Sequence, residues 1–139
     1  MRRFGEPLVA GQKYTLRPGA YVILPAGGQL LLTLQDDEMQ LPGGGIDPGE
    51  SPLRTLHREV FEETGWKIAN PIKIGAYRRF CYMPDYDLWA EKLCHVYLAR
   101  PVLKLAEPLE EGHTAIWASK EIAAKGLASA GDRAFVAAL

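Results

Sequence analysis

The sequence predicts a mixed α/β domain in which helices flank a sheet. Short apolar runs of strand length lie on both sides of a strong helix signal in mid-chain, and further helix signals lie near the C-terminus. The composition agrees, because 47% of the 139 residues are hydrophobic and 24% are charged, a balance typical of globular proteins. We therefore expect a single domain over residues 1–139.

The first third of the chain is expected to form short strands. Residues 1–13, rich in Gly, Pro and charge, predict an irregular lead-in. Residues 20–24 and 29–34 are apolar runs separated by the turn sequence Pro25-Ala26-Gly27-Gly28, and they predict a hairpin. A third short strand is predicted at 39–41, and it runs into the glycines Gly43, Gly44 and Gly45.

The clearest helix lies between Ser51 and Gly65. Ser51 is a favourable N-cap, and Pro52 suits the first helical position because its missing N–H has no partner there. Gly65 supplies a left-handed stop. Apolar side chains recur at spacings of three and four residues and predict a core-facing stripe formed by Leu53, Leu56 and Val60.

After this helix the pattern returns to strands. Extended runs are predicted at 68–80, where Pro71 interrupts the pattern, and at 93–98 and 114–117. A polar, aromatic loop is expected at 82–87. Two C-terminal helices are predicted, one capped by Ser119 and ending near Ala124, and the other capped by Asp132 and running to the C-terminus.

Composition excludes several classes of function. Sixteen Lys and Arg residues oppose seventeen Asp and Glu, so the net charge of -1 creates no bulk attraction to nucleic acid or to an anionic membrane. The sequence contains no membrane-spanning run and no secretory signal, and we expect a cytoplasmic protein with neither a membrane nor a nucleic-acid partner. Cys81 and Cys94 lack the spacing of a metal motif and are expected to be buried free thiols.

Three carboxylates share one face of the predicted helix. Glu59, Glu62 and Glu63 are spaced three and four residues apart, away from the apolar stripe. They lie in the last two turns, where the helix dipole disfavours anions by about 0.3–1 kcal/mol each. A solvated acidic face explains their solubility but not this position. Mg²⁺ or Mn²⁺, which take carboxylate and carbonyl oxygens as ligands, would compensate the charge.

The segment before the helix adds candidate ligands. Glycines at 43–45 permit close backbone approach, so that a carbonyl could face a metal ion, but the Gly-Lys-Ser/Thr of a nucleotide P-loop is absent. Arg58 is the one cation within the acidic group. It could pair with Glu50 and fix the loop against the helix, or pair with Glu62 one turn further along.

Together these residues form the pattern Gly44-x5-Glu50-x7-Arg58-Glu59-Val60-x-Glu62-Glu63-x-Gly65-Trp66. This pattern resembles the signature of the Nudix hydrolases at every fixed position. The resemblance implies a Nudix-type α/β/α sandwich with a mixed sheet and the loop-helix of the Nudix box. It implies that Arg58 and Glu50 orient the site. It also implies a set of ligands for Mg²⁺ or Mn²⁺: the carbonyl of Gly44, and Glu59, Glu62 and Glu63.

The substrates of that family are nucleoside diphosphates linked to a further group, so the resemblance implies a metal-dependent pyrophosphohydrolase in which water attacks phosphorus. Bound metal would reverse the repulsion between the carboxylates and a pyrophosphate, and would polarise its oxygens. The general base is expected to be Glu59 or Glu62 in the box, or a loop carboxylate, Glu110 or Glu111.

Outside the box, the sequence offers hints of substrate contacts. Arg78 and Arg79 could meet phosphate, and Tyr82 lies near the place where the family's diadenosine polyphosphate hydrolases carry a base-stacking tyrosine. Nucleotide sugars and triphosphates are equally open as substrates, and a homodimer is compatible with the sequence. The alternatives to an enzyme are a non-catalytic Nudix-fold module that binds a nucleotide or regulates, and a plain α/β domain whose acidic helix face contacts a partner.

Overall fold

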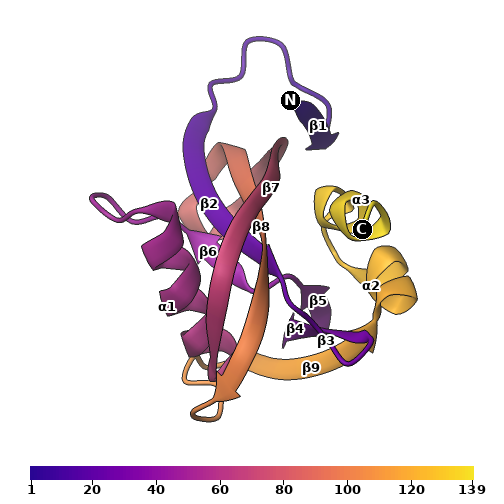
Figure 1. Cartoon of the computed structure of the whole chain (residues 1–139). Helices are drawn as coiled ribbons and strands as arrows, with labels where there is room; N and C mark the ends of the chain where they lie inside the picture. The colour runs from indigo at the N-terminus through magenta and orange to yellow at the C-terminus, as the bar shows by residue number, and fades with distance from the viewer.

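Helices cover both faces of a β layer in the computed structural model, which describes residues 1–139 (Figure 1). One sheet has the order β1-β7-β8-β2-β6 and contains both parallel and antiparallel pairs. Its strands are β1 (Arg2–Gly5), β7 (Trp66–Met83), β8 (Leu88–Lys104), β2 (Thr15–Ile23) and β6 (Gly43–Gly45). The second sheet consists of β3 (Pro25–Ala26), β4 (Gln29–Gln35), β5 (Glu38–Gln40) and β9 (His113–Ser119), which pairs with β4.

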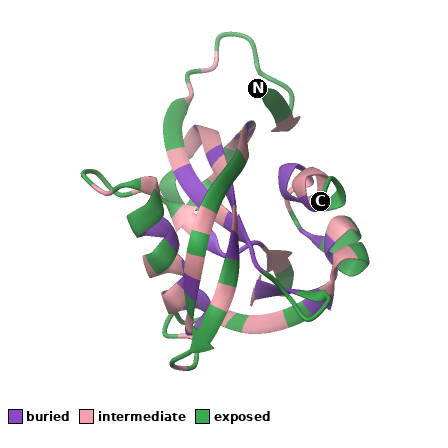
Figure 2. Ribbon diagram, viewed as in Figure 1, coloured by how far each residue is buried: buried purple, intermediate pink, exposed green.

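The helix α1 (Pro52–Thr64) covers one face of this layer, and α2 (Lys120–Gly126) and α3 (Ala130–Ala137) cover the other. A hydrophobic core lies on each side of the β layer. Figure 2 shows buried segments in purple on the strands and on the helices. On the α1 side, Leu56 and Val60 pack with apolar residues of the sheets. On the other side, Val136 of α3 belongs to a second cluster. The predicted α/β/α sandwich with a mixed sheet is confirmed.

The ends of α1 lie where the sequence predicts them. The Ser51 hydroxyl accepts a hydrogen bond from the Arg54 N–H at 3.1 Å, and Gly65 (φ 79°) donates its N–H to the Phe61 carbonyl at 2.8 Å. The apolar stripe is correct for Leu56 and Val60, which are fully buried, but wrong for Leu53, which is 44% exposed in the first turn.

Two expectations about the first strands are wrong. The segment expected to be an irregular lead-in contains β1, which pairs in parallel with β7 from Arg2 opposite Tyr77 to Gly5 opposite Phe80. The predicted hairpin exists only at its tip, where β3 pairs with β4. The strand before it, β2, instead pairs in parallel with β8. Parallel pairing joins residues far apart in the chain, so it leaves no local turn signal.

The second half of the chain follows the prediction with longer strands. β7 and β8 form one long antiparallel hairpin, with a register shift between Ala69 and Ile72 at the expected Pro71 interruption. The loop expected at 82–87 is reduced to the short 3₁₀ helix η1 (Pro84–Tyr86) and its flanks. Cys94 is buried as expected, whereas Cys81 is only partly buried, and both thiols are free.

The C-terminal helices differ from the prediction at one cap. Ser119 caps α2 as predicted, because its hydroxyl accepts the Ile122 N–H at 3.1 Å. Asp132 was expected to cap the last helix, but α3 begins at Ala130 and Asp132 lies inside its first turn. Its carboxylate instead accepts the Tyr77 hydroxyl at 2.7 Å. None of the helices has the length and apolar character needed to cross a membrane.

Candidate functional site

The glycine strand β6 pairs with β2 and contacts α1, and a side chain would meet neighbouring atoms at two of its positions. A Cβ on Gly43 (φ 148°) would lie 2.2 Å from the Ala20 carbonyl oxygen, so a side chain there would separate β6 from β2. A Cβ on Gly44 would lie 2.8 Å from the carboxyl carbon of Glu59. The Gly44 backbone therefore directly contacts the acidic face of α1.

Glu63 is the most enclosed carboxyl group of this face. It is 5% exposed, and its Oε1 accepts the Gly43 N–H at 3.1 Å. Burial raises its pKa to about 9, and the nearby carboxylate of Glu59 acts in the same direction. Burial also raises the pKa of Glu59, against the lowering effect of Arg58. The site thus concentrates carboxyl groups whose ionised forms are poorly compensated by the protein's own charges.

Arg58 joins the loop to the helix face. Its Nε and Nη2 donate to the two carboxylate oxygens of Glu50, each at 2.9 Å, and its Nη1 donates to Glu59 at 3.0 Å and Glu62 at 3.3 Å. The Glu50 carboxylate also accepts the Thr55 hydroxyl, and these hydrogen bonds, the one from Arg58 above all, hold its pKa down to about 2. Both sequence alternatives for Arg58, pairing with Glu50 and with Glu62, occur together.

The loop between β8 and β9 brings a further carboxylate to the same face. The backbone N–H groups of Leu109 and Glu110 donate to the Glu62 carbonyl at 2.8 Å and 3.0 Å, which fixes the loop against the end of α1. Carboxylate oxygens of Glu59, Glu62 and Glu110 lie within 4.8 Å of one another. Glu111, the other candidate in this loop, is exposed and belongs to no such group.

A histidine that the sequence analysis did not select also reaches the site. Ligand atoms of Glu63, Glu110 and His113 form a second group within 4.8 Å. His113 belongs to no sequence motif. It reaches the site because β9, the strand that carries it, pairs with β4. Hard oxygen donors at such separations, partly buried and rich in negative charge, fit a divalent cation such as Mg²⁺.

The predicted substrate contacts divide between two faces of β7. Arg79 points, with Tyr77, into a cavity under α3. Arg78 instead pairs with Glu91 at 3.3 Å on the opposite face. Tyr82 shares that opposite face, because side chains alternate along a strand, and its hydroxyl donates to Asp87. Of these three candidates, only Arg79 lines the cavity under α3.

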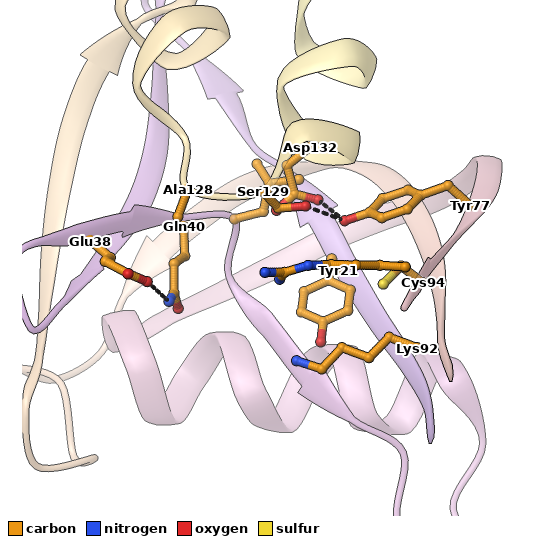
Figure 3. Close-up of a pocket in the computed structure, with 11 residues that line it drawn as sticks. Tyr21, Glu38, Gln40, Tyr77, Lys92, Cys94, Ala128, Ser129 and Asp132 are labelled. Carbon is orange, nitrogen blue, oxygen red and sulfur yellow. Dashed lines mark hydrogen bonds between the residues drawn. The ribbon is translucent and has the colours of Figure 1, made fainter. Parts of the chain in front are cut away.

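The cavity under α3 has a volume of about 180 Å³, and Figure 3 shows its lining. Tyr77 donates to Asp132 and lies 2.9 Å from the Ser129 hydroxyl. Burial raises the pKa of Asp132 to about 6. Tyr21 and Lys92 line this cavity and also an adjoining hollow of about 290 Å³ that includes Glu59 and Arg17.

The two hollows therefore adjoin at Tyr21 and Lys92, one beside the Glu59 carboxylate and the other under α3. We call this pair of hollows the path. Sequence reasoning missed Tyr21, Lys92 and Arg17, because each lies on a strand with no motif around it. The alternation of side chains along β2 and β8 was the signal available in the sequence that these residues share one face. It shows which face of the sheet that is only after the partners of each strand are known.

Comparison with known proteins agrees with this geometry. The model of the NUDIX domain matches residues 13–139. The chain belongs to the Nudix family. A crystal structure of a MutT NUDIX hydrolase from Burkholderia pseudomallei superposes with a TM-score of 0.74, covering 88% of this chain and 97% of that one at 19% identity. This similarity shows that the two proteins share the same fold.

Two curated relatives of this Nudix protein match over shorter segments. A Bacillus subtilis protein, provisionally named an 8-oxo-dGTP diphosphatase, is 42% identical over 74 residues, which are 51% of this chain and 50% of that protein. An RNA pyrophosphohydrolase from Bartonella bacilliformis is 51% identical over 57 residues, 41% of this chain and 31% of that protein. The matched segments thus span half or less of these relatives.

Proposed function

We propose that this Nudix protein is a metal-dependent pyrophosphohydrolase that cleaves a nucleoside diphosphate linked to another moiety by attack of water on phosphorus. The observation that carries the proposal is the convergence of the Glu59, Glu62 and Glu110 carboxylates beside the Gly44 backbone. Helix α1 places two of these carboxylates against its own dipole, and the single positive charge of Arg58 is shared between them, so a bound divalent cation would supply the remaining compensation.

In this proposal the Gly44 carbonyl and the carboxylates of Glu59, Glu62 and Glu63 hold Mg²⁺ or Mn²⁺. Bound there, the cation would polarise phosphoryl oxygens and neutralise the charge that develops on them. Arg58 holds Glu50 and the two nearest box carboxylates in one hydrogen-bonded group, which pre-organises the loop and the helix for the cation.

A carboxylate must also accept a proton from the attacking water. Among the candidates, Glu59 and Glu62 accept hydrogen bonds from Arg58. Glu110 approaches the same centre from the loop and makes no ion pair with Arg58. Its exposed carboxylate can reach a water molecule, and Glu111 has no comparable position. We therefore assign the general-base role to Glu110.

The nucleoside part is proposed to occupy the path beyond Glu59. The adjoining hollow offers Arg17 and Lys92 to phosphate oxygens, and the cavity under α3 offers polar side chains that can hydrogen-bond to a heterocyclic base. The names of the curated relatives, which refer to a nucleoside triphosphate and to RNA, are consistent with a substrate of the nucleotide class.

The experiment is a cleavage assay on a panel of nucleoside triphosphates, nucleotide sugars and diadenosine polyphosphates, with Mg²⁺, with Mn²⁺ and with chelator. Glu62→Gln should lose the cleavage seen in the wild-type protein. Glu111→Gln, which changes a neighbouring exposed carboxylate, serves as the matched control and should retain it. Nucleotide-induced thermal stabilisation without cleavage of any compound would instead support the non-catalytic binding module.

A further inference from the structure

His113 is the first residue of β9, and its imidazole lies between Thr33 of β4 and Glu110 of the preceding loop. Its side chain is 4% exposed, although the residues on both sides of it are exposed. An imidazole held so closely beside the Glu63 and Glu110 carboxylates has a fixed orientation, and each ring nitrogen has its own neighbour.

One ring nitrogen is held by β4. Nδ1 of His113 lies 2.9 Å from the hydroxyl of Thr33, a fully buried residue in the middle of that strand. The register pairs Thr33 with Ala115 and Gln35 with His113, so Thr33 and His113 are diagonal neighbours on one face of the sheet. The hydrogen bond therefore ties the first residue of β9 to the interior of β4.

The other ring nitrogen faces the loop carboxylate. Nε2 lies 3.8 Å from Oε2 of Glu110, and the backbone N–H of His113 donates to the Glu110 carbonyl at 3.3 Å. The Glu110 side chain is 44% exposed and has no other ion-pair partner. Without a neighbour on the protein side, such a side chain would sample several rotamers in solvent.

We propose that His113 is a positioning residue, which holds the Glu110 carboxylate over the acidic face of α1 and is itself oriented by the Thr33 hydroxyl. When Thr33 donates to Nδ1, the ring hydrogen stands on Nε2. At 3.8 Å this N–H is too far from Glu110 Oε2 for a hydrogen bond, but its positive end is directed to the carboxylate and attracts it. The inference rests on the proposed function, because the position of Glu110 matters for turnover only if Glu110 acts on the attacking water.

A pair of Thr33 variants separates the hydroxyl from the packing. Thr33→Val keeps the volume and loses the hydroxyl, and we expect kcat to fall by about 10- to 100-fold with KM nearly unchanged, the usual loss when a residue behind the reacting groups is removed. Thr33→Ser restores the hydroxyl and should restore kcat. Normal turnover in Thr33→Val, or the reverse order of the two variants, would overturn the proposal.

A second readout does not depend on turnover. The chain has 3 histidines, so long-range ¹H–¹⁵N spectra of the metal-free protein, recorded about two pH units above the ordinary histidine pKa, can assign the His113 tautomer. We expect Nε2–H in the wild type and a mixture in Thr33→Val. Nδ1–H in the wild type would overturn the proposal, since Nε2 would then present a lone pair to a carboxylate. If the wild type cleaves no diphosphate, the proposed function fails. The tautomer measurement still tests whether Thr33 orients the His113 ring.

Discussion

Gly44 and Glu59 are in close contact: with Glu59 in its present position, a Cβ at position 44 would lie 2.8 Å from the Glu59 carboxyl carbon and 2.9 Å from one of its oxygens. The contact joins a strand of the sheet to the acidic face of α1. Because the carboxylate is the end of a flexible side chain, it can move aside when the space is filled, and the fold need not change.

Gly44→Ala should therefore reduce activity without a large loss of stability. We expect the displaced Glu59 carboxylate to lower kcat by about 100-fold, as removal of a group that stabilises transition-state charge typically does. The melting temperature should change little. Gly126→Ala is the matched control, because a Cβ there also meets only the end of a flexible side chain, Met39 Cε at 2.5 Å, and lies in α2, away from the acidic face. It should leave turnover intact. Equal activity of the two variants would remove Gly44 and Glu59 from the reacting centre.

The sequence predicted the bounds and caps of the helix that carries the box glutamates well, and the reason is physical. Caps, helix periodicity and the spacing of the box glutamates are encoded within the 44–66 segment, and α1 forms as predicted. Strand partners are not encoded locally. The parallel pairing of β2 with β8 places Arg17 opposite Lys92, and the pairing of β4 with β9 brings His113 to the site, so these contacts required the structure.

The substrate contacts illustrate the same limit on one strand. Arg78 and Arg79 are consecutive, and the sequence could not say which of them faces the site. A strand sends consecutive side chains to opposite faces, so one of the two had to point away. The structure directs Arg79 to the cavity and Arg78 to Glu91.

Glu63→Gln should abolish turnover and stabilise the metal-free protein. The amide keeps an oxygen to accept the Gly43 N–H, while it removes a buried acid next to Glu59. We expect a higher melting temperature without metal, and a smaller rise on adding Mg²⁺, because binding to the folded state is weakened. Thermal scans with and without Mg²⁺, together with the cleavage assay, measure both effects. An unchanged Mg²⁺-dependent rise would show that Glu63 is not a ligand.

Lys92→Met should weaken substrate binding more than catalysis. Lys92 lines both hollows along the proposed nucleotide path and has no ion-pair partner on the protein, so its ammonium is free for phosphate. Loss of one charged hydrogen bond predicts a rise in KM of about tenfold or more. Arg78→Met removes a cation from the opposite face and should leave KM unchanged. Steady-state kinetics of both variants on the best substrate of the panel test this, and a similar KM for the two would contradict the assigned path.

Asp132→Asn should change how stability depends on pH. Burial raises the pKa of Asp132 from 3.8 to about 6, so between these values the folded protein keeps a proton that the unfolded chain has released. Stability conferred by this group is therefore present below about pH 4 and is lost as the pH rises to about 6, by about 3 kcal/mol. Asparagine does not ionise and can still accept the Tyr77 hydroxyl. We expect the variant, compared with the wild type, to gain stability between pH 4 and pH 7 in urea unfolding. Asp85→Asn changes an exposed carboxylate, serves as the control and should follow the wild-type curve of stability against pH. If the curve of Asp132→Asn also ran parallel to that of the wild type, Asp132 would be ionised in the folded protein over the whole range from pH 4 to pH 7.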